Sequence, residues 1–203
     1  MIGKLDEIEP RVVTVIGAGV AGTQSINKAI DNNALVKVVD SSKAKLDNLE
    51  SKYGSNNIEY ILSTNDSVQS SINESDLVIG SVYVVGKEAP KVVSRDMLSS
   101  MSPGTVMVDV SIDQGGCFET SKPTTHDKPT FLENDIVHYC VTNMPGAVPL
   151  TATQALNKVT LSYIKDLANK GIMKALEEDE HLKNGLNIQN GLITHPGVKE
   201  ALG

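Results

Sequence analysis

The segment Val12–Gly22 constrains the fold more than any other part of the sequence. It reads VVTVIGAGVAG, a short run of β-branched residues that ends abruptly in glycine. Such a run is typical of a strand buried on both faces, as in a parallel sheet. Gly17, Gly19 and Gly22 follow at the G-x-G-x-x-G spacing, and the apolar positions after them recur at helical intervals. The segment therefore predicts a strand, a tight turn and a helix in immediate succession.

Each of the three glycines has a separate physical role in a turn of this kind. Gly17 permits the tight turn out of the strand, Gly19 lets the backbone approach a pyrophosphate, and Gly22 lets the helix pack close to the strand. The free N–H groups of the first helical turn, and the positive end of the helix dipole, would face the phosphates. The spacing alone is weak evidence, because glycine-rich strand ends also occur as ordinary tight turns.

Asp40 strengthens this interpretation because it closes the next predicted strand, Leu35–Val39. The dinucleotide-binding fingerprint requires an acidic residue about 20 residues beyond the glycines. A carboxylate there accepts hydrogen bonds from the adenosine ribose and would repel a 2′-phosphate, which favours NAD over NADP. The alternative is that Asp40 is a simple strand-end turn residue. The register of glycines, strand, helix and acid favours the nucleotide-binding role.

The rest of the chain alternates short apolar runs with helical patterns, in units of roughly 30 residues, which predicts βαβ units and a parallel sheet. Further strands are expected at 59–62, 76–81, 106–110 and 137–141, and helices at 22–32, 42–53, 67–73, 94–99 and 152–168. Beyond about Gly171 the chain becomes polar, with no core-forming pattern. We therefore expect an α/β protein, with a Rossmann-type doubly wound parallel sheet over residues 1–170 and a C-terminal helical tail over 171–203.

Composition limits the kinds of partner that the chain can have. Its 203 residues carry a net charge of -7, and only 3% of them are aromatic. An acidic chain does not attract nucleic-acid phosphates or anionic lipids, and few aromatic side chains are present to stack on bases. No apolar stretch approaches the roughly 20 residues of a membrane span, and the charged segment 1–11 lacks the apolar region of a secretion signal. We expect a cytoplasmic protein without nucleic-acid or membrane partners.

The cysteines and histidines are not spaced to bind a metal. Cys117 and Cys140 lie far apart, without a CxxC motif or a histidine cluster, so two reduced and buried thiols are expected. His126 lies in a polar loop, where a single histidine is usually solvated. The other histidines also lack a partner at metal-ligand spacing, namely His138, His181 and His195.

Three longer motifs resemble one family of Rossmann proteins. They read SDLVIGSVYVVGKEAPKVV over 75–93, MVDVSIDQGGCFETSKPTTHDKPTF over 107–131 and HYCVTNMPGAVPLTATQAL over 138–156. In these motifs the chain is similar to alanine dehydrogenases and proton-translocating transhydrogenases, and GCFETSKPTTHDKPTF resembles the former more. The resemblance runs from about Val12 to Gly171 and continues more loosely to the C-terminus. It implies the NAD-binding portion of an enzyme that converts L-alanine reversibly to pyruvate and ammonia while NAD is reduced to NADH.

The resemblance also implies a set of cofactor-contacting residues. The backbone of Val20 and Ala21 would contact the pyrophosphate, Lys45 would lie near the adenosine, and Ser63 would flank the adenine. A strand end with Val82 and Tyr83 would line the groove, and Tyr83 is a departure because the family usually has an aliphatic residue there. Two segments would border the nicotinamide, and their members are Val110, Ser111, Ile112, Asp113, Val141, Thr142, Asn143 and Met144.

Asp113 is, by the same resemblance, the one active-site acid that this part of the family contributes. The pattern alone supports a structural role equally, because a carboxylate just before Gly115–Gly116 is also typical of an Asx turn or a helix cap. The turn at Asn143–Gly146 is likewise an ordinary strand-end turn when the resemblance is set aside.

The residues that this family uses to bind and protonate its substrate have no matching positions in the chain. The family carries an arginine for the substrate carboxylate, a lysine for the carbonyl oxygen and an acid–base histidine in an N-terminal domain. We expect that domain to be absent, and segment 171–203 to be a remnant of the substrate domain. Such a chain would bind NAD but turn alanine over very slowly or not at all. The alternatives are a stand-alone dinucleotide-binding module without catalysis and a transhydrogenase fragment. The family's hexamers imply self-association.

Overall fold

The computed structural model describes residues 2–3 and 6–202, and the chain divides into two compact units. The first comprises Met1–Val84 and Glu88–Thr142, and the second comprises Val85–Lys87 and Asn143–Gly203. The division therefore lies near Asn143, whereas the sequence pattern suggested residue 170. The helix before residue 170 groups with the tail and not with the sheet.

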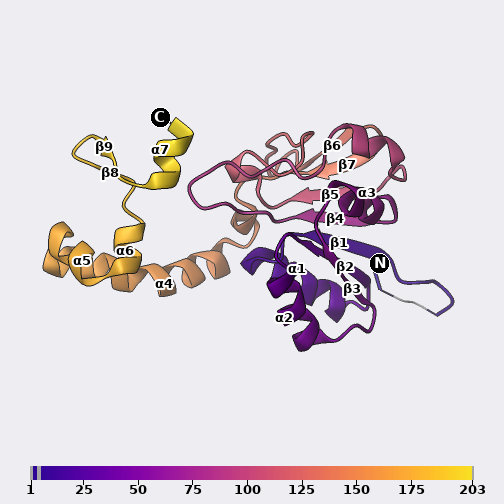
Figure 1. The fold of residues 1–203 in the computed structure, drawn as a ribbon, viewed down its shortest axis with the longest axis horizontal. Helices are drawn as coiled ribbons and strands as arrows, with labels where there is room; N and C mark the ends of the chain where they lie inside the picture. The colour runs from indigo at the N-terminus through magenta and orange to yellow at the C-terminus, as the bar shows by residue number, and fades with distance from the viewer. Residues whose placement is uncertain (1, 4–5, 203) are drawn as a thin grey trace. The chain divides into compact units, whose positions relative to one another are not determined.

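The described part of the first unit is built around one seven-stranded sheet (Figure 1). Its strands are β1 (Val12–Ile16), β2 (Leu35–Asp40), β3 (Ile58–Leu62), β4 (Leu77–Gly80), β5 (Val106–Asp109), β6 (Thr130–Glu133) and β7 (Ile136–Tyr139). They follow the order β3-β2-β1-β4-β5-β7-β6, and every neighbouring pair is parallel except β7 with the edge strand β6. The expected Rossmann-type doubly wound sheet is confirmed, whereas β6 was not predicted.

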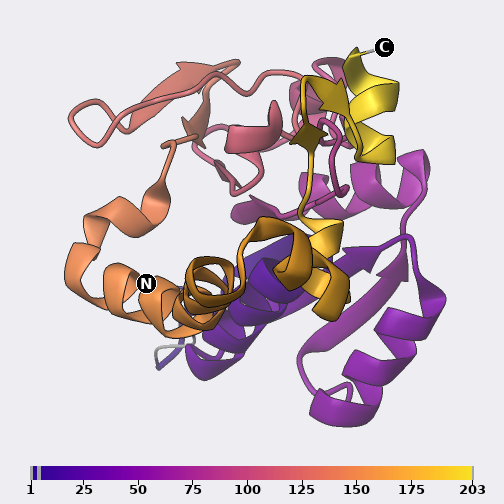
Figure 2. The same ribbon diagram turned by 90° about the vertical axis from the view of Figure 1, so that its left-hand side faces the viewer.

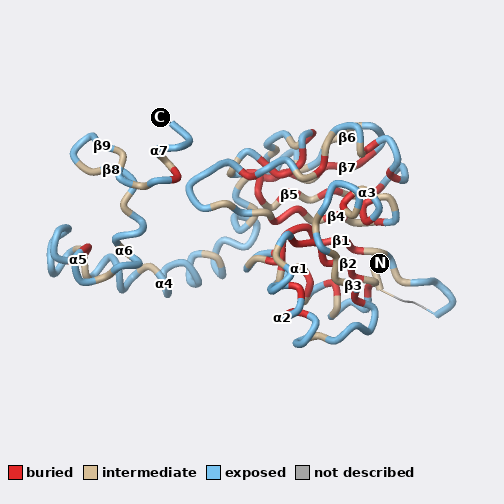
Figure 3. Tube along the Cα trace, in the orientation of Figure 1, coloured by how far each residue is buried: buried red, intermediate tan, exposed pale blue. Residues whose placement is uncertain are grey.

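Helices cover both faces of this sheet. They are α1 (Val20–Asp31), α2 (Lys43–Tyr53), α3 (Asn65–Asn73) and the short 3₁₀ helices η1 (Asp96–Ser100) and η2 (Ile112–Gln114). On one face Ile26 of α1 and Leu46 of α2 pack on the buried valines of β1 and β2. On the other face Ile72 of α3, Leu98 of η1 and Phe118 form a second cluster. Figure 3 shows the buried residues concentrated along the strands and the inward sides of these helices.

The chain reverses its direction across the sheet between β1 and β4. From β1 it runs outward to β2 and β3, and it then returns to the other side of β1 for β4 and β5. In parallel sheets of this topology, a crevice forms outside the carboxyl ends of the strands at the point of reversal. The segments that follow β1, β2, β4 and β5 therefore lie around one crevice.

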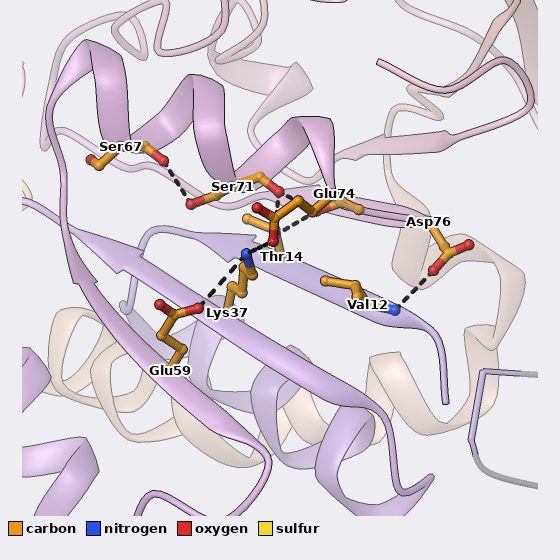
Figure 4. A network of polar contacts seen from close by, with 9 residues as sticks. Val12, Thr14, Lys37, Glu59, Ser67, Ser71, Glu74 and Asp76 are labelled. Atoms are coloured by element: carbon orange, nitrogen blue, oxygen red, sulfur yellow. Dashed lines mark hydrogen bonds and ion pairs between the residues drawn. The ribbon is translucent and has the colours of Figure 1, made fainter. Parts of the chain in front are cut away.

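A polar network ties α3 to the sheet at some distance from these strand ends (Figure 4). Thr14 is fully buried in β1, and its hydroxyl lies 2.6 Å from Ser75 Oγ, so this buried polar group is satisfied. At the amino end of β4, the Asp76 carboxylate accepts a hydrogen bond of 2.9 Å from the Val12 N–H. Lys37 of β2 forms ion pairs with glutamates on β3 and after α3.

The sheet face that carries α1 and α2 also carries a row of partly exposed apolar residues. The members of this apolar row are in register across β4, β5 and β7, and they are Leu77, Ile79, Val106, Val108, Val137 and Tyr139. On the opposite face of the same strands, Val78, Met107 and Ile136 are fully buried. Parallel sheets are normally covered on both faces, so the apolar row offers a surface to a further element.

The second unit, described by itself, has little core. Its elements are η3 (Met144–Ala147), α4 (Pro149–Lys170), α5 (Ile172–Glu178), α6 (Glu180–Asn184), the short hairpin of β8 (Ile188–Gln189) and β9 (Leu192–Ile193), and α7 (Pro196–Leu202). The long helix α4, orange in Figure 2, has no buried residue and exposes Leu156, Val159 and Ile164. The elements after Gly171, α5 to α7 and the hairpin, are short because the apolar pattern of that segment is weak. Within the described residues, no helix has both the length and the apolar character needed to cross a membrane.

Candidate functional site

A groove of about 690 Å³ lies at the carboxyl ends of β1, β2, β4 and β5. Many of the residues expected to contact a dinucleotide line it, namely Gly17, Gly19, Val20, Ala21, Asp40, Lys45, Val82, Tyr83, Val110 and Ser111. The groove is lined in addition by Ser41, Ser81, Val84, Pro90 and Gln114, which the sequence pattern did not single out. Its position at the reversal of strand order is the one at which open α/β sheets bind ligands.

The three glycines of the turn differ in the space around them. A Cβ on Gly17 would lie 2.6 Å from Ser81 O, and its φ of +99° is unfavourable for other residues. A Cβ on Gly22 would lie 1.8 Å from Gly17 O, so α1 passes too close for any side chain there. A Cβ on Gly19 would meet nothing within 4 Å and would stand on the wall of the groove. This geometry supports a turn role for Gly17, a packing role for Gly22 and a ligand-approach role for Gly19.

The amino end of α1 is open to an anion. Gly19 is its N-cap residue and provides no side-chain hydrogen bond, and the first turn contains no acidic residue. Val20 is 88% exposed, and both Val20 and Ala21 line the groove. The first N–H groups of a helix have no partner within the helix, so an uncapped end facing a groove attracts phosphate oxygens.

Asp40 contacts the glycine turn and also lines the groove. Its Oδ2 accepts a hydrogen bond of 2.7 Å from the Ala18 N–H, and its Oδ1 accepts one of 2.8 Å from the Ser42 N–H. The side chain is 7% exposed and lines the groove, and Lys45 Nζ lies 3.7 Å from Oδ2. A carboxylate oxygen accepts more than one hydrogen bond. Asp40 therefore stabilises the glycine turn and still presents acceptor capacity to a ligand.

Ser81 is a site residue that the sequence pattern missed. It follows β4, lines the groove, and donates a hydrogen bond of 2.7 Å to Gly17 O. This bond joins the end of β4 to the glycine turn. Ser81 could have been identified from its position, because it directly follows the strand that lies next to β1 at the reversal of strand order.

The loop after β5 reaches the groove with Val110, Ser111 and Gln114. The Ser111 hydroxyl donates a hydrogen bond of 2.7 Å to Val82 O and so joins this loop to the end of β4. Neither Ile112, which is buried, nor Asp113, which is exposed on η2, is among the residues that line the groove. No hydrogen bond or ion pair links the Asp113 carboxylate to the described residues.

The structure does not bring every expected residue to the groove. Ser63 lies beyond the end of β3, where its N–H donates to Asp40 O at 3.0 Å. Val141 is fully buried, and Thr142 is the last residue of the first unit. The remaining pair, Asn143 and Met144, belongs to the second unit, where Asn143 lines a separate cavity of about 760 Å³ between η3 and α4.

Both cysteines are free and buried, as the sequence predicted. Burial raises the pKa of the Cys117 thiol, and the neighbouring Asp109 carboxylate raises it further. Burial also raises the pKa of the Cys140 thiol. Two protonated, inaccessible thiols are poor nucleophiles and poor metal ligands. In the part of the chain that the structure describes, no three residues of the metal-ligating types lie together.

His138 is a buried base in β7. Its Nε2 lies 2.8 Å from Thr120 Oγ1, its Nδ1 lies 3.2 Å from Ile136 O, and its ring stacks on Phe131 at 4.9 Å. Burial lowers the pKa of His138 below its ordinary value, although the carboxylate of Glu133 opposes the shift. The folded protein therefore holds this imidazole neutral at neutral pH.

We predict that lowering the pH from about 7 to 5 reduces the free energy of unfolding through His138. The unfolded chain binds a proton there near pH 6.5, whereas the folded chain binds it only at a lower pH, so protonation favours unfolding between these two values. Well above pH 6.5 the imidazole is neutral in both the folded and the unfolded state, so it contributes nothing to the pH dependence of the free energy of unfolding. Urea unfolding at several pH values should show a shallower pH dependence for His138→Gln. The exposed His181 gives the control, His181→Gln, and equal slopes for both variants would contradict the prediction.

Comparison with known proteins gives one consistent match. The family model described as "Alanine dehydrogenase/PNT, C-terminal domain" matches residues 1–196. The alanine dehydrogenase of Halomonas elongata is 50% identical over 196 residues, which are 97% of this chain and 53% of that protein. The alanine dehydrogenase of Staphylococcus haemolyticus is 42% identical over 204 residues, and the match covers 100% of this chain and 54% of that protein. The chain thus spans about half the length of the curated relatives that it matches.

Solved structures give the same picture. A structure of L-alanine dehydrogenase superposes with a TM-score of 0.86 and 43% identity, over 98% of this chain and 55% of that one. A transhydrogenase from Sinorhizobium meliloti superposes with a TM-score of 0.72 and 24% identity, over 93% of this chain and 51% of that one, and so shares the fold.

Proposed function

Because the chain belongs to the alanine dehydrogenase/PNT C-terminal domain family, we propose that it is the NAD-binding part of an alanine dehydrogenase. The family and its nucleotide-binding domain imply NAD as the cofactor. The relatives at 42–50% identity are alanine dehydrogenases, whereas the transhydrogenase likeness is one of fold, so the dehydrogenase origin is favoured over a transhydrogenase fragment.

The groove at the reversal of strand order is the observation that carries this proposal. Strand order places the glycine turn and Asp40 at its β1–β2 end, and Ser111 at its β4–β5 end. A dinucleotide that follows this order would place its adenosine near Asp40, its pyrophosphate over Gly19, and its nicotinamide near Ser111. The buried carboxylate of Asp40 favours ribose hydroxyls and disfavours a 2′-phosphate, so NAD fits better than NADP.

The reaction of the longer protein would be the oxidative deamination of L-alanine. NAD would accept the hydride from the amine carbon and water would supply the carbonyl oxygen, so that pyruvate, ammonium, NADH and a proton would be the products. This chain would contribute the bound cofactor and, from the loop after β5, the carboxylate of Asp113 as an active-site acid. Groups that bind the substrate carboxylate and transfer protons would come from the remainder of the longer protein, so we expect this chain alone to turn over alanine very slowly or not at all.

Partners are proposed on the same basis. The apolar row on β4, β5 and β7 is suited to contact with a further domain or with a second copy of the chain. Segment 171–203 would belong to the substrate domain, and the assembly would be a cytoplasmic homo-oligomer, as the family resemblance implies.

Calorimetric titration with NAD and NADP tests the cofactor assignment directly. We expect NAD to bind with a stoichiometry of one and NADP to bind more weakly. The alanine assignment is tested by adding the separately produced N-terminal half of the Halomonas elongata relative and measuring alanine-dependent NADH formation. A gain in rate supports the proposal. NAD binding without any gain in the rate of NADH formation supports a stand-alone binding module. If NAD does not bind, both the alanine dehydrogenase proposal and the binding module are ruled out.

A further inference from the structure

We propose that Asp109 is a positioning residue that fixes the loop after β5 in the shape needed at the nicotinamide end of the groove. Asp109 is the last residue of β5 and is fully buried, so it does not touch the groove itself. No ion pair neutralises its carboxylate within the described residues. A buried carboxylate without a cation needs several hydrogen-bond donors, and the loop provides them. The inference rests on the proposed NAD-binding function.

The hydrogen bonds of Asp109 join the two ends of the loop. Its Oδ1 accepts from the Ser111 N–H at 2.9 Å, just after the strand. Its Oδ2 accepts from the Cys117 N–H at 2.8 Å and from the Ser121 hydroxyl at 2.5 Å, beyond the loop. The Phe118 N–H lies 3.3 Å from the same oxygen. The Asp109 carboxylate therefore ties the start of the loop to its end, alongside the backbone hydrogen bond of 3.0 Å from the Gly116 N–H to Ser111 O.

The loop is closely fitted around this carboxylate. A Cβ on Gly116 would lie 2.8 Å from Asp109 Oδ2 and 2.9 Å from Ser121 Cβ, and Gly116 has a φ of +75°. On the outer side, Lys91 Nζ donates to the carbonyl groups of Gly115 and Gly116. Lys91 thus holds the carbonyl groups of Gly115 and Gly116, whereas Asp109 holds the N–H groups of Ser111 and Cys117 on either side of them.

Ser111 connects Asp109 to the groove. Its N–H is held by Asp109, its hydroxyl donates to Val82 O, and its side chain lines the groove. Gln114, in the middle of the same loop, also lines the groove. The adenosine end is built on β1 and β2 and shares none of these hydrogen bonds. A change at Asp109 should therefore alter the nicotinamide end and spare the adenosine end.

Asp109→Asn tests the proposal, because an amide keeps the shape but cannot accept from every donor in this set. Binding of NADH and of ADP-ribose, which lacks the nicotinamide, is measured by titration for wild type and variant. We expect NADH binding to weaken about tenfold, ADP-ribose binding to be unchanged, and the nicotinamide fluorescence of bound NADH to change. The matched control is Asp76→Asn, since Asp76 also accepts a strand N–H but lies at the amino ends of the strands. In the control, the ratio of the two affinities should stay at its wild-type value.

Equal weakening of NADH and ADP-ribose would show a purely structural role and overturn the proposal, as would unchanged binding of both. If Asp109→Asn does not fold, Ser121→Ala removes a single donor to the carboxylate and should weaken NADH selectively, by a smaller factor. Unchanged NADH binding in that variant would overturn the proposal. A wild-type chain that binds neither ligand would overturn the proposed function and this inference with it.

Discussion

Replacing Gly19 with valine is expected to abolish measurable NAD binding while leaving the fold intact. A Cβ at this position meets no atom within 4 Å, and the backbone φ of -77° suits any residue, so valine causes no strain. Its methyl groups would stand on the groove wall at the amino end of α1 and keep phosphate oxygens from the free N–H groups. Loss of two charge-assisted hydrogen bonds corresponds to at least about a hundredfold in affinity. Calorimetric titration gives the affinity, and thermal unfolding checks that stability is unchanged.

Gly22→Ala is the comparison that separates ligand approach from packing. The added Cβ would lie 1.8 Å from Gly17 O, so α1 must move away from the strand. Overpacking of this kind typically costs about 1–3 kcal/mol. We expect Gly22→Ala to lower the unfolding temperature and Gly19→Val not to do so. If Gly19→Val binds NAD as tightly as wild type does, the pyrophosphate does not lie at this turn and the binding mode is wrong.

The strands of the first half of the sheet could be predicted because their apolar sequence pattern agrees with their burial in the folded protein. The run Val12–Ile16 is buried on both faces and therefore reads as continuously apolar. The edge strand Thr130–Glu133 could not be predicted, since it is only four residues long and alternates exposed and partly buried positions. Helix α4 is longer than the pattern over 152–168 suggested, because Pro149 is tolerated in a first helical turn.

The candidate site shows the same limit at two neighbouring aspartates. In the motif VDVSID, the family resemblance points to Asp113, whereas the pattern alone supports a structural role equally and singles out nothing at Asp109. Strand alternation places Asp109 on the same face as Met107, where both are fully buried. Asp113 lies on η2, beyond the strand, and is exposed. Asp109 becomes an internal hydrogen-bond acceptor because the loop folds back around it. Such a contact cannot be predicted from the local sequence pattern.

Asp40→Asn is the second substitution with a large expected effect, because one carboxylate serves both the turn and the ligand. The amide can accept from the Ala18 N–H or from the Ser42 N–H, but its NH₂ group must then face the other donor. An unsatisfied buried donor costs about 1–3 kcal/mol, so the free energy of unfolding should fall by an amount of that order. NAD binding should weaken further than this loss of stability explains, since the acceptor for the ribose hydroxyls is also lost. The preference for NAD over NADP should shrink, because the negative charge that disfavours a 2′-phosphate is gone.

Asp47→Asn provides the matched control for this experiment. Asp47 lies on α2 and is exposed, and its carboxylate forms an ion pair of 3.2 Å with Lys43 one helical turn away. Surface pairs of this kind contribute little to stability, so the variant should unfold and bind NAD as wild type does. Urea unfolding and paired titrations with NAD and NADP measure all of these quantities. If Asp40→Asn loses stability but keeps its wild-type ratio of NAD to NADP affinity, Asp40 supports the glycine turn and does not select the cofactor.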